Sequence, residues 1–260
     1  MKGLLQRWQA HREAKVLARR AIPDPLWQLT LARLPFLAQR SDADLAELRR
    51  LASLFLDQKQ FTGADGLVVD DAMAVCIAVQ AVLPVLRVGL APYDGFVGIV
   101  VHPDEVVARR EVMDDDGVVH AYDEVLAGEA MEGGPVMLSW RDVADAGETA
   151  ASGYNVVIHE FAHVLDMGDG AADGVPPLPS AQARRDWLAV LMPAYDRHGE
   201  QVVCGYDTLL DPYGAQGPEE FFAVASETFF VNPKELRAEH SDLYGLLARY
   251  FRQDPAAFTP

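Results

Sequence analysis

The chain has 260 residues, half of them apolar, which is enough for one large domain with its own core. The chain has two cysteines, too few for a disulfide framework, which favours a reducing compartment. Its N-terminus lacks the apolar stretch of a signal peptide, so we expect a cytoplasmic protein. The net charge of −17 is uneven, because residues 1–20 hold six basic residues against one acidic residue (+5) and leave −22 for the remainder. The strong negative charge of this remainder argues against direct binding of nucleic acid.

In chain order, residues 1–20 predict a basic helix, which Pro23 ends. We therefore expect a basic helical extension over residues 1–22 and a single domain over 23–260. A solvated helix face is the simpler interpretation of the basic residues, with an acidic partner or a membrane surface as the alternative. Residues 41–61 predict an amphipathic helix capped by Ser41. Residues 70–86 predict a buried helix, too short to span a bilayer.

The middle of the chain changes character. Short apolar runs bounded by Gly, Pro and Asp predict strands within residues 94–106, 117–125 and 133–143. The helical period then returns over residues 154–168, 181–198 and 218–233. Helices, a small group of strands and again helices indicate an α+β fold in one domain.

The stretch HEFAH carries the first candidate site. His159 and His163 are four residues apart, so on a helix both side chains lie on one face and can bind one metal ion. Glu160 points to the side of that face, where it can reach a metal-bound water without being a ligand. The alternative is an ordinary core helix whose two histidines are hydrogen-bonded.

A catalytic zinc ion needs a third protein ligand. The pattern HExxHxxGxxH does not supply it, because Asp166 and Asp169 stand where its glycine and third histidine belong. A later helix is strongly apolar and carries Glu220 and Glu227 on nearly the same face. A buried carboxylate needs a partner, which zinc and its histidines can provide; the alternative is that both glutamates face solvent.

HEFAHVLDMGDG, the tyrosine seven residues before the glutamate in YGAQGPEEFFAVASETFF, and LSWRDV together resemble the Mlc titration factor A family of zinc-dependent peptidases. The stretch YGAQGPEEFFA, with its tyrosine seven residues before a glutamate, also resembles the catalytic domain of anthrax lethal factor. The resemblance implies a zincin-like metallopeptidase domain with a small sheet and an HExxH helix. It further implies Zn²⁺ held by His159, His163 and Glu220, with Glu160 as general base and Tyr213 steadying the oxyanion.

Two acidic residues keep open roles at this stage. Glu227 is the alternative ligand, although we favour a hydrogen bond from it to a histidine ring. Asp166 lies on the same helix face as the two histidines and can do the same; the alternative is a helix-terminal residue in water.

The predicted reaction is hydrolysis of peptide bonds in a peptide or protein, and an aminopeptidase-like preference is what the resemblance implies. Residues 134–140 predict the edge strand along which such a substrate aligns, or simply an ordinary strand of the sheet. The family name records binding to a sugar-responsive transcriptional repressor. The second hypothesis is therefore a regulatory protein that sequesters a repressor, with a structural or regulatory zinc site.

Overall fold

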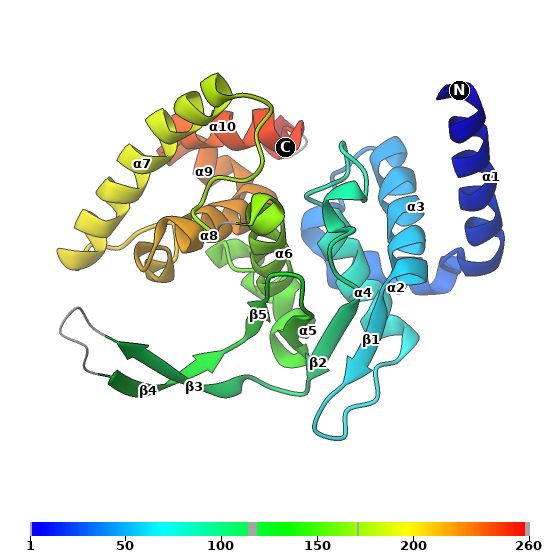
Figure 1. Cartoon of the computed structure of the whole chain (residues 1–260), viewed down its shortest axis with the longest axis horizontal. Coiled ribbons are helices and arrows are strands. Elements are labelled where there is room, and N and C mark those ends of the chain that lie inside the picture. Colours follow the sequence, from blue (N-terminus) through cyan, green and yellow to red (C-terminus); the bar gives the residue numbers. More distant parts are fainter. Residues whose placement is uncertain (1, 114–118, 171, 258–260) are drawn as a thin grey trace.

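The computed structural model describes residues 2–113, 119–170 and 172–257. Figure 1 shows the N-terminal helices on one side of the molecule, the C-terminal helices on the other, and two central helices between them. The N-terminal helices are α1 (Lys2–Arg20), α2 (Asp24–Arg33), α3 (Asp42–Gln58) and α4 (Asp71–Val82). The central pair is α5 (Trp140–Thr149) and α6 (Val156–Asp166). The C-terminal group is α7 (Ala181–Val203), α8 (Pro218–Val231), α9 (Pro233–Glu239) and α10 (Ser241–Phe251).

A small mixed sheet lies beside α5 and α6 (Figure 1). Its strands are β1 (Gln60–Gly63), β2 (Gly98–His102), β6 (Val136–Ser139) and β5 (Gly128–Ala130), in that spatial order. The first three are parallel, and β5 runs antiparallel at one edge. Two further strands, β3 (Val106–Met113) and β4 (Val119–Leu126), pair with each other as an antiparallel ribbon that projects from the sheet (Figure 1). The α+β prediction is confirmed.

The predicted N-terminal helices form for the expected reasons. Ser41 accepts a hydrogen bond from the Asp44 N–H and begins α3, while Asp70 caps α4 in the same way. Most of α4 is buried in the core, including Cys76. Phe161 of α6 packs against Phe55, Tyr93 and Phe96, so α6 is fixed to the N-terminal half by aromatic contacts.

The strand predicted within residues 117–125 is confirmed over its described part, where it forms β4 of the separate ribbon; residues 117 and 118 lie outside the described residues. Another strand prediction needs correction. Within 134–140 only Val136–Ser139 is a strand, and it is internal, between β2 and β5, so the predicted edge strand is wrong. All four of its residues are buried, which is typical of a strand covered on both faces. Among the described residues, no helix is long and apolar enough to cross a membrane.

Candidate metal site

Helix α6 positions the two histidines. Asn155 begins the helix by accepting a hydrogen bond from the Ile158 N–H, and the apolar residues around the motif bury the remaining faces. His159 and His163 lie one turn apart, with their Nε2 atoms separated by 3.1 Å. Two ring nitrogens that face each other this closely can share one cation.

Helix α8 brings a carboxylate to the same point. Glu220 Oε2 lies 3.1 Å from His159 Nε2 and 3.3 Å from His163 Nε2. In the described part of the chain, these three residues are the group of His, Cys, Asp and Glu side chains that can hold a metal ion. The three donor atoms form a nearly equilateral triangle, so the predicted ligands do converge.

Glu227 approaches His159 from the other side of the ring. It is 2% exposed, and its Oε1 lies 2.7 Å from His159 Nδ1, while its Oε2 accepts a hydrogen bond from the Asn155 N–H. A carboxylate on Nδ1 fixes the ring orientation and leaves Nε2 directed at the donor triangle. The alternative that both glutamates face solvent is therefore wrong.

The electrostatics of the cluster favour a positive ion. Burial acts to raise the pKa of Glu220, but hydrogen bonds from His159 and His163 prevail and lower it to about 2. Burial disfavours the charged form of His159, yet the carboxylates of Glu227 and Glu220 hold the pKa of its ring well above the usual value. Burial raises the pKa of Glu160 to about 7.

Glu160 is 5% exposed and packs directly on the edge strand of the sheet. A Cβ atom added to Gly128 of β5 would lie 2.4 Å from Glu160 Oε1 and 2.6 Å from its Cγ. Only a glycine therefore lets this side chain lie against β5.

Tyr213 lies in the short 3-10 helix Pro212–Ala215, just before α8, and its ring centroid is 5.9 Å from that of His159. Tyr213, His159 and Glu160 line one pocket of about 230 Å³. The structure thus brings together the five residues predicted from the sequence.

Comparison with known proteins identifies the family of this chain. The family model for the glucose-regulated metallopeptidase M90 matches residues 5–252. This chain belongs to the M90 metallopeptidase family. It is 40% identical over 250 residues to an uncharacterized protein of Synechocystis sp., with 95% of this chain and 90% of that protein covered.

Two relatives carry a name that bears on function. The chain is 38% identical over 234 residues to Mlc titration factor A of Pectobacterium atrosepticum (89% and 87% covered). It is 35% identical over 257 residues to Mlc titration factor A of Yersinia pestis (96% and 90% covered). The resemblance to that family is confirmed.

A series of buried hydrogen bonds, called here the polar chain, adjoins the site and was not predicted from the sequence. Asn155 Nδ2 donates to Gln80 Oε1 at 2.7 Å, and Gln80 Nε2 donates to the Cys76 carbonyl at 3.0 Å. Gln80 and Asn155 are both fully buried. Because Asn155 also donates to Glu227, this chain links α4 to the ring of His159. The only hint in the sequence was a glutamine inside an apolar run.

Asp166 differs from both interpretations of its sequence position. It is fully buried rather than in water, and its Oδ2 accepts a hydrogen bond from the Gly174 N–H at 2.8 Å rather than from a histidine ring. Its Oδ1 finds no hydrogen-bond partner among the described residues. Burial raises the pKa of this carboxyl to about 7.

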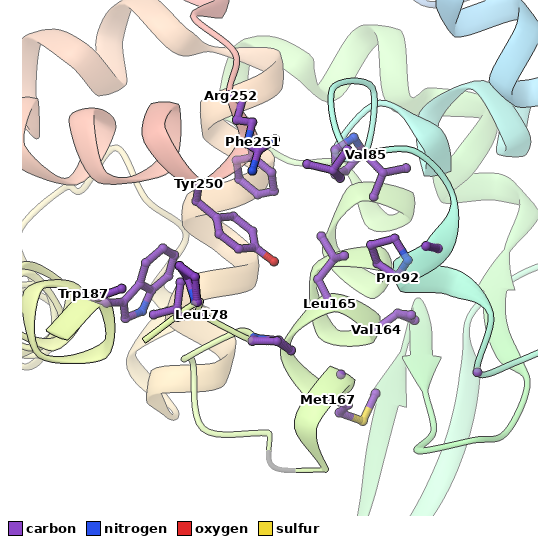
Figure 2. A pocket seen from close by; sticks show the side chains of 18 of the residues that line it. Val85, Pro92, Val164, Leu165, Met167, Leu178, Trp187, Tyr250, Phe251 and Arg252 are labelled. Carbon is purple, nitrogen blue, oxygen red and sulfur yellow. The ribbon is translucent and has the colours of Figure 1, made fainter. Parts of the chain in front are cut away.

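A larger cleft of about 840 Å³ lies elsewhere on α6. It is lined mainly by apolar side chains, among them Val164 and Leu165, and Figure 2 shows the Tyr250 hydroxyl directed into it. The described residues that line it do not include the three donor residues, Glu160 or Tyr213. The chemistry of the smaller pocket is therefore separate from this cleft.

Proposed function

We propose that this M90 protein is a zinc-dependent peptidase in a zincin-like domain. The observation that carries the proposal is the donor triangle of His159, His163 and Glu220, with sides of 3.1–3.3 Å. Ligands about 2.0–2.1 Å from a tetrahedral zinc ion are about 3.3–3.4 Å apart, so the donor set fits this ion. Three protein ligands leave the fourth position for water, as catalytic sites require.

Zinc bound here would acidify its water and polarise the scissile carbonyl. Glu160 accepts the proton of the attacking water and later donates it to the leaving amine. Tyr213, from the wall of the same pocket, stabilises the oxyanion by hydrogen bonding. Glu227 orients the His159 ring.

The outer strand of the sheet gives the substrate its alignment. Strand β5 is an outer strand, and its Gly128 lies against Glu160. A peptide that adds to β5 by backbone hydrogen bonds thereby passes next to the general base. The absence of a side chain at Gly128 keeps the distance between base and peptide short. An aminopeptidase-like preference remains part of this proposal.

The second candidate function follows from the relatives' name, Mlc titration factor A. On this basis the protein binds a repressor of the Mlc type, in the cytoplasm, with the metal in a structural or regulatory role. The buried Glu160 beside the ligands favours catalysis, because a purely structural site needs four closed ligands and no base.

The deciding experiment measures zinc content and peptide hydrolysis together. Glu160→Gln should retain about one zinc ion per chain and lose hydrolysis, whereas His159→Ala should lose both. His11→Ala, at an exposed position on α1, is the matched control and should change neither. Hydrolysis that survives in Glu160→Gln would remove the general base from the mechanism. A wild-type protein that binds zinc, hydrolyses no peptide and retains a repressor would favour the second candidate.

A further inference from the structure

The base of the β3–β4 ribbon carries an exposed apolar pair. Val107 and Val125 are 63% and 61% exposed, and they lie directly opposite each other in the ladder. Cross-strand partners share one face, so the two side chains form one apolar surface. Val125 also lines the pocket that holds His159 and Glu160. The apolar surface is therefore continuous with the candidate active site.

The ribbon leads directly into the edge strand, because Ala127 alone separates β4 from β5. From Gly128, where Glu160 packs, to Val125 is three residues, or about 10 Å in an extended chain. A peptide that pairs with β5 and continues in this direction passes the base of the ribbon. Its side chains at that distance from the cleaved bond meet Val125 and Val107.

We propose that Val107 and Val125 form a binding surface for an apolar side chain of the substrate. This proposal rests on the proposed peptidase function. The position recognised lies about three residues from the cleaved bond, since strands rise about 3.3 Å per residue. The substrate class is thus an extended polypeptide rather than a dipeptide or tripeptide.

The pocket next to this surface has a different character. Glu105 and the exposed Asp211 both line it, and Glu105 is already paired with Arg141 at 2.8 Å. Asp211 has no ion pair among the described residues, so its negative charge disfavours acidic substrate residues close to the cleaved bond. The apolar contact with the peptide is made by Val107 and Val125 of the ribbon, farther from the cleaved bond.

The test compares two peptide lengths, one double variant and one single-residue control. All peptides have the same residues before the cleaved bond. The short peptide extends two residues on the C-terminal side of that bond, and the long peptide extends five and carries Leu or Asp at the third. Val107→Thr with Val125→Thr keeps the β-branched shape that strands favour while replacing one methyl of each residue by a hydroxyl. Val68→Thr is the control: Val68 is 83% exposed and follows β1, at the opposite edge of the sheet.

We expect the double variant to lose about tenfold in kcat/KM on the long Leu peptide, the range typical of lost apolar contacts in a substrate pocket. Its kcat/KM on the short peptide should match the wild type, and Val68→Thr should match it on both. An equal loss on both lengths, or no loss on the long peptide, would overturn the proposal. So would a wild-type preference for Asp over Leu.

A failure of the peptidase function itself gives a different result. If the wild type cleaves neither peptide, the affinity of each protein for a fluorescent long Leu peptide decides about the surface. Weaker binding by the double variant retains the surface as a peptide-binding one, and equal binding removes it. A concentration-dependent dimer that the double variant abolishes would assign the pair to self-association and overturn the proposal as well.

Discussion

Replacing Asp166 by Asn should make the protein more stable at neutral and alkaline pH. The carboxyl is fully buried near the C-terminal end of α6, with one oxygen on the Gly174 N–H and the other without a partner among the described residues. An asparagine keeps an acceptor for that N–H and carries no charge. The substitution therefore removes the cost of burying a carboxylate while the local hydrogen bond persists.

The size of the effect follows from the pKa. Burial raises the pKa of Asp166 from 3.8 to about 7, so between these values the folded state holds a proton that the unfolded chain has lost. Wild-type stability consequently falls as the pH rises from about 4 to about 7, and the full penalty persists above that range. A difference of about three pKa units corresponds to about 4 kcal/mol, which we take as an upper limit.

The assay is urea unfolding of metal-free protein at pH 5 and pH 8. Asp166→Asn should raise the free energy of unfolding at pH 8 by about 2–4 kcal/mol, and by about 2 kcal/mol less at pH 5. A gain that is equal at both pH values, or a loss of stability at pH 8, would refute the reasoning. An equal gain would mean that the carboxyl of Asp166 does not titrate between pH 5 and pH 8. A loss of stability at pH 8 would mean that the ionised carboxylate has a stabilising partner.

Three further predictions concern the metal site. Glu220→Ala should lower zinc occupancy more than Glu227→Ala, because only the Glu220 carboxylate belongs to the donor triangle; elemental analysis in which the order is reversed would exchange their roles. Tyr213→Phe should reduce kcat by about 10²–10³ with zinc retained, as for a lost oxyanion donor, and loss of zinc would make the tyrosine structural. Gly128→Ala should displace Glu160 and reduce kcat at least tenfold with zinc content unchanged, so wild-type turnover would contradict the close contact.

The histidine pair was predictable because it depends on local periodicity. A spacing of four residues places His159 and His163 on one helix face in any α-helix, and α6 forms as its apolar pattern predicts. The inference that an acid on a strongly apolar helix has a buried partner applied equally to Glu220 and Glu227. Only the family resemblance selected Glu220, which the structure places against both histidines. The boundary of the basic extension near residue 22 stays a prediction.

The remaining features depend on contacts between distant segments. Which strand lies at the edge is decided by pairing, and the edge strand β5 is only three residues long, without an apolar pattern to mark it. Asp166 looks in the sequence like a helix-terminal residue in water, but the loop that contains Gly174 folds over it. Gln80 lies 75 residues from its partner Asn155, so no sequence spacing connects the two.

One histidine therefore lies between two carboxylates of a single helix, and the two have different environments. Glu220 contacts His159 Nε2 at a partly exposed position beside the pocket, whereas Glu227 contacts Nδ1 from the interior. Asn155 contacts Glu227 and, through Gln80, the core helix α4. A spacing of seven residues, about two turns, lets one helix place Glu220 in the donor triangle and Glu227 against the Nδ1 side of the His159 ring. The buried polar chain from Gln80 to Glu227 then fixes the orientation of the His159 ring, so that its Nε2 faces the donor triangle without a bound ion.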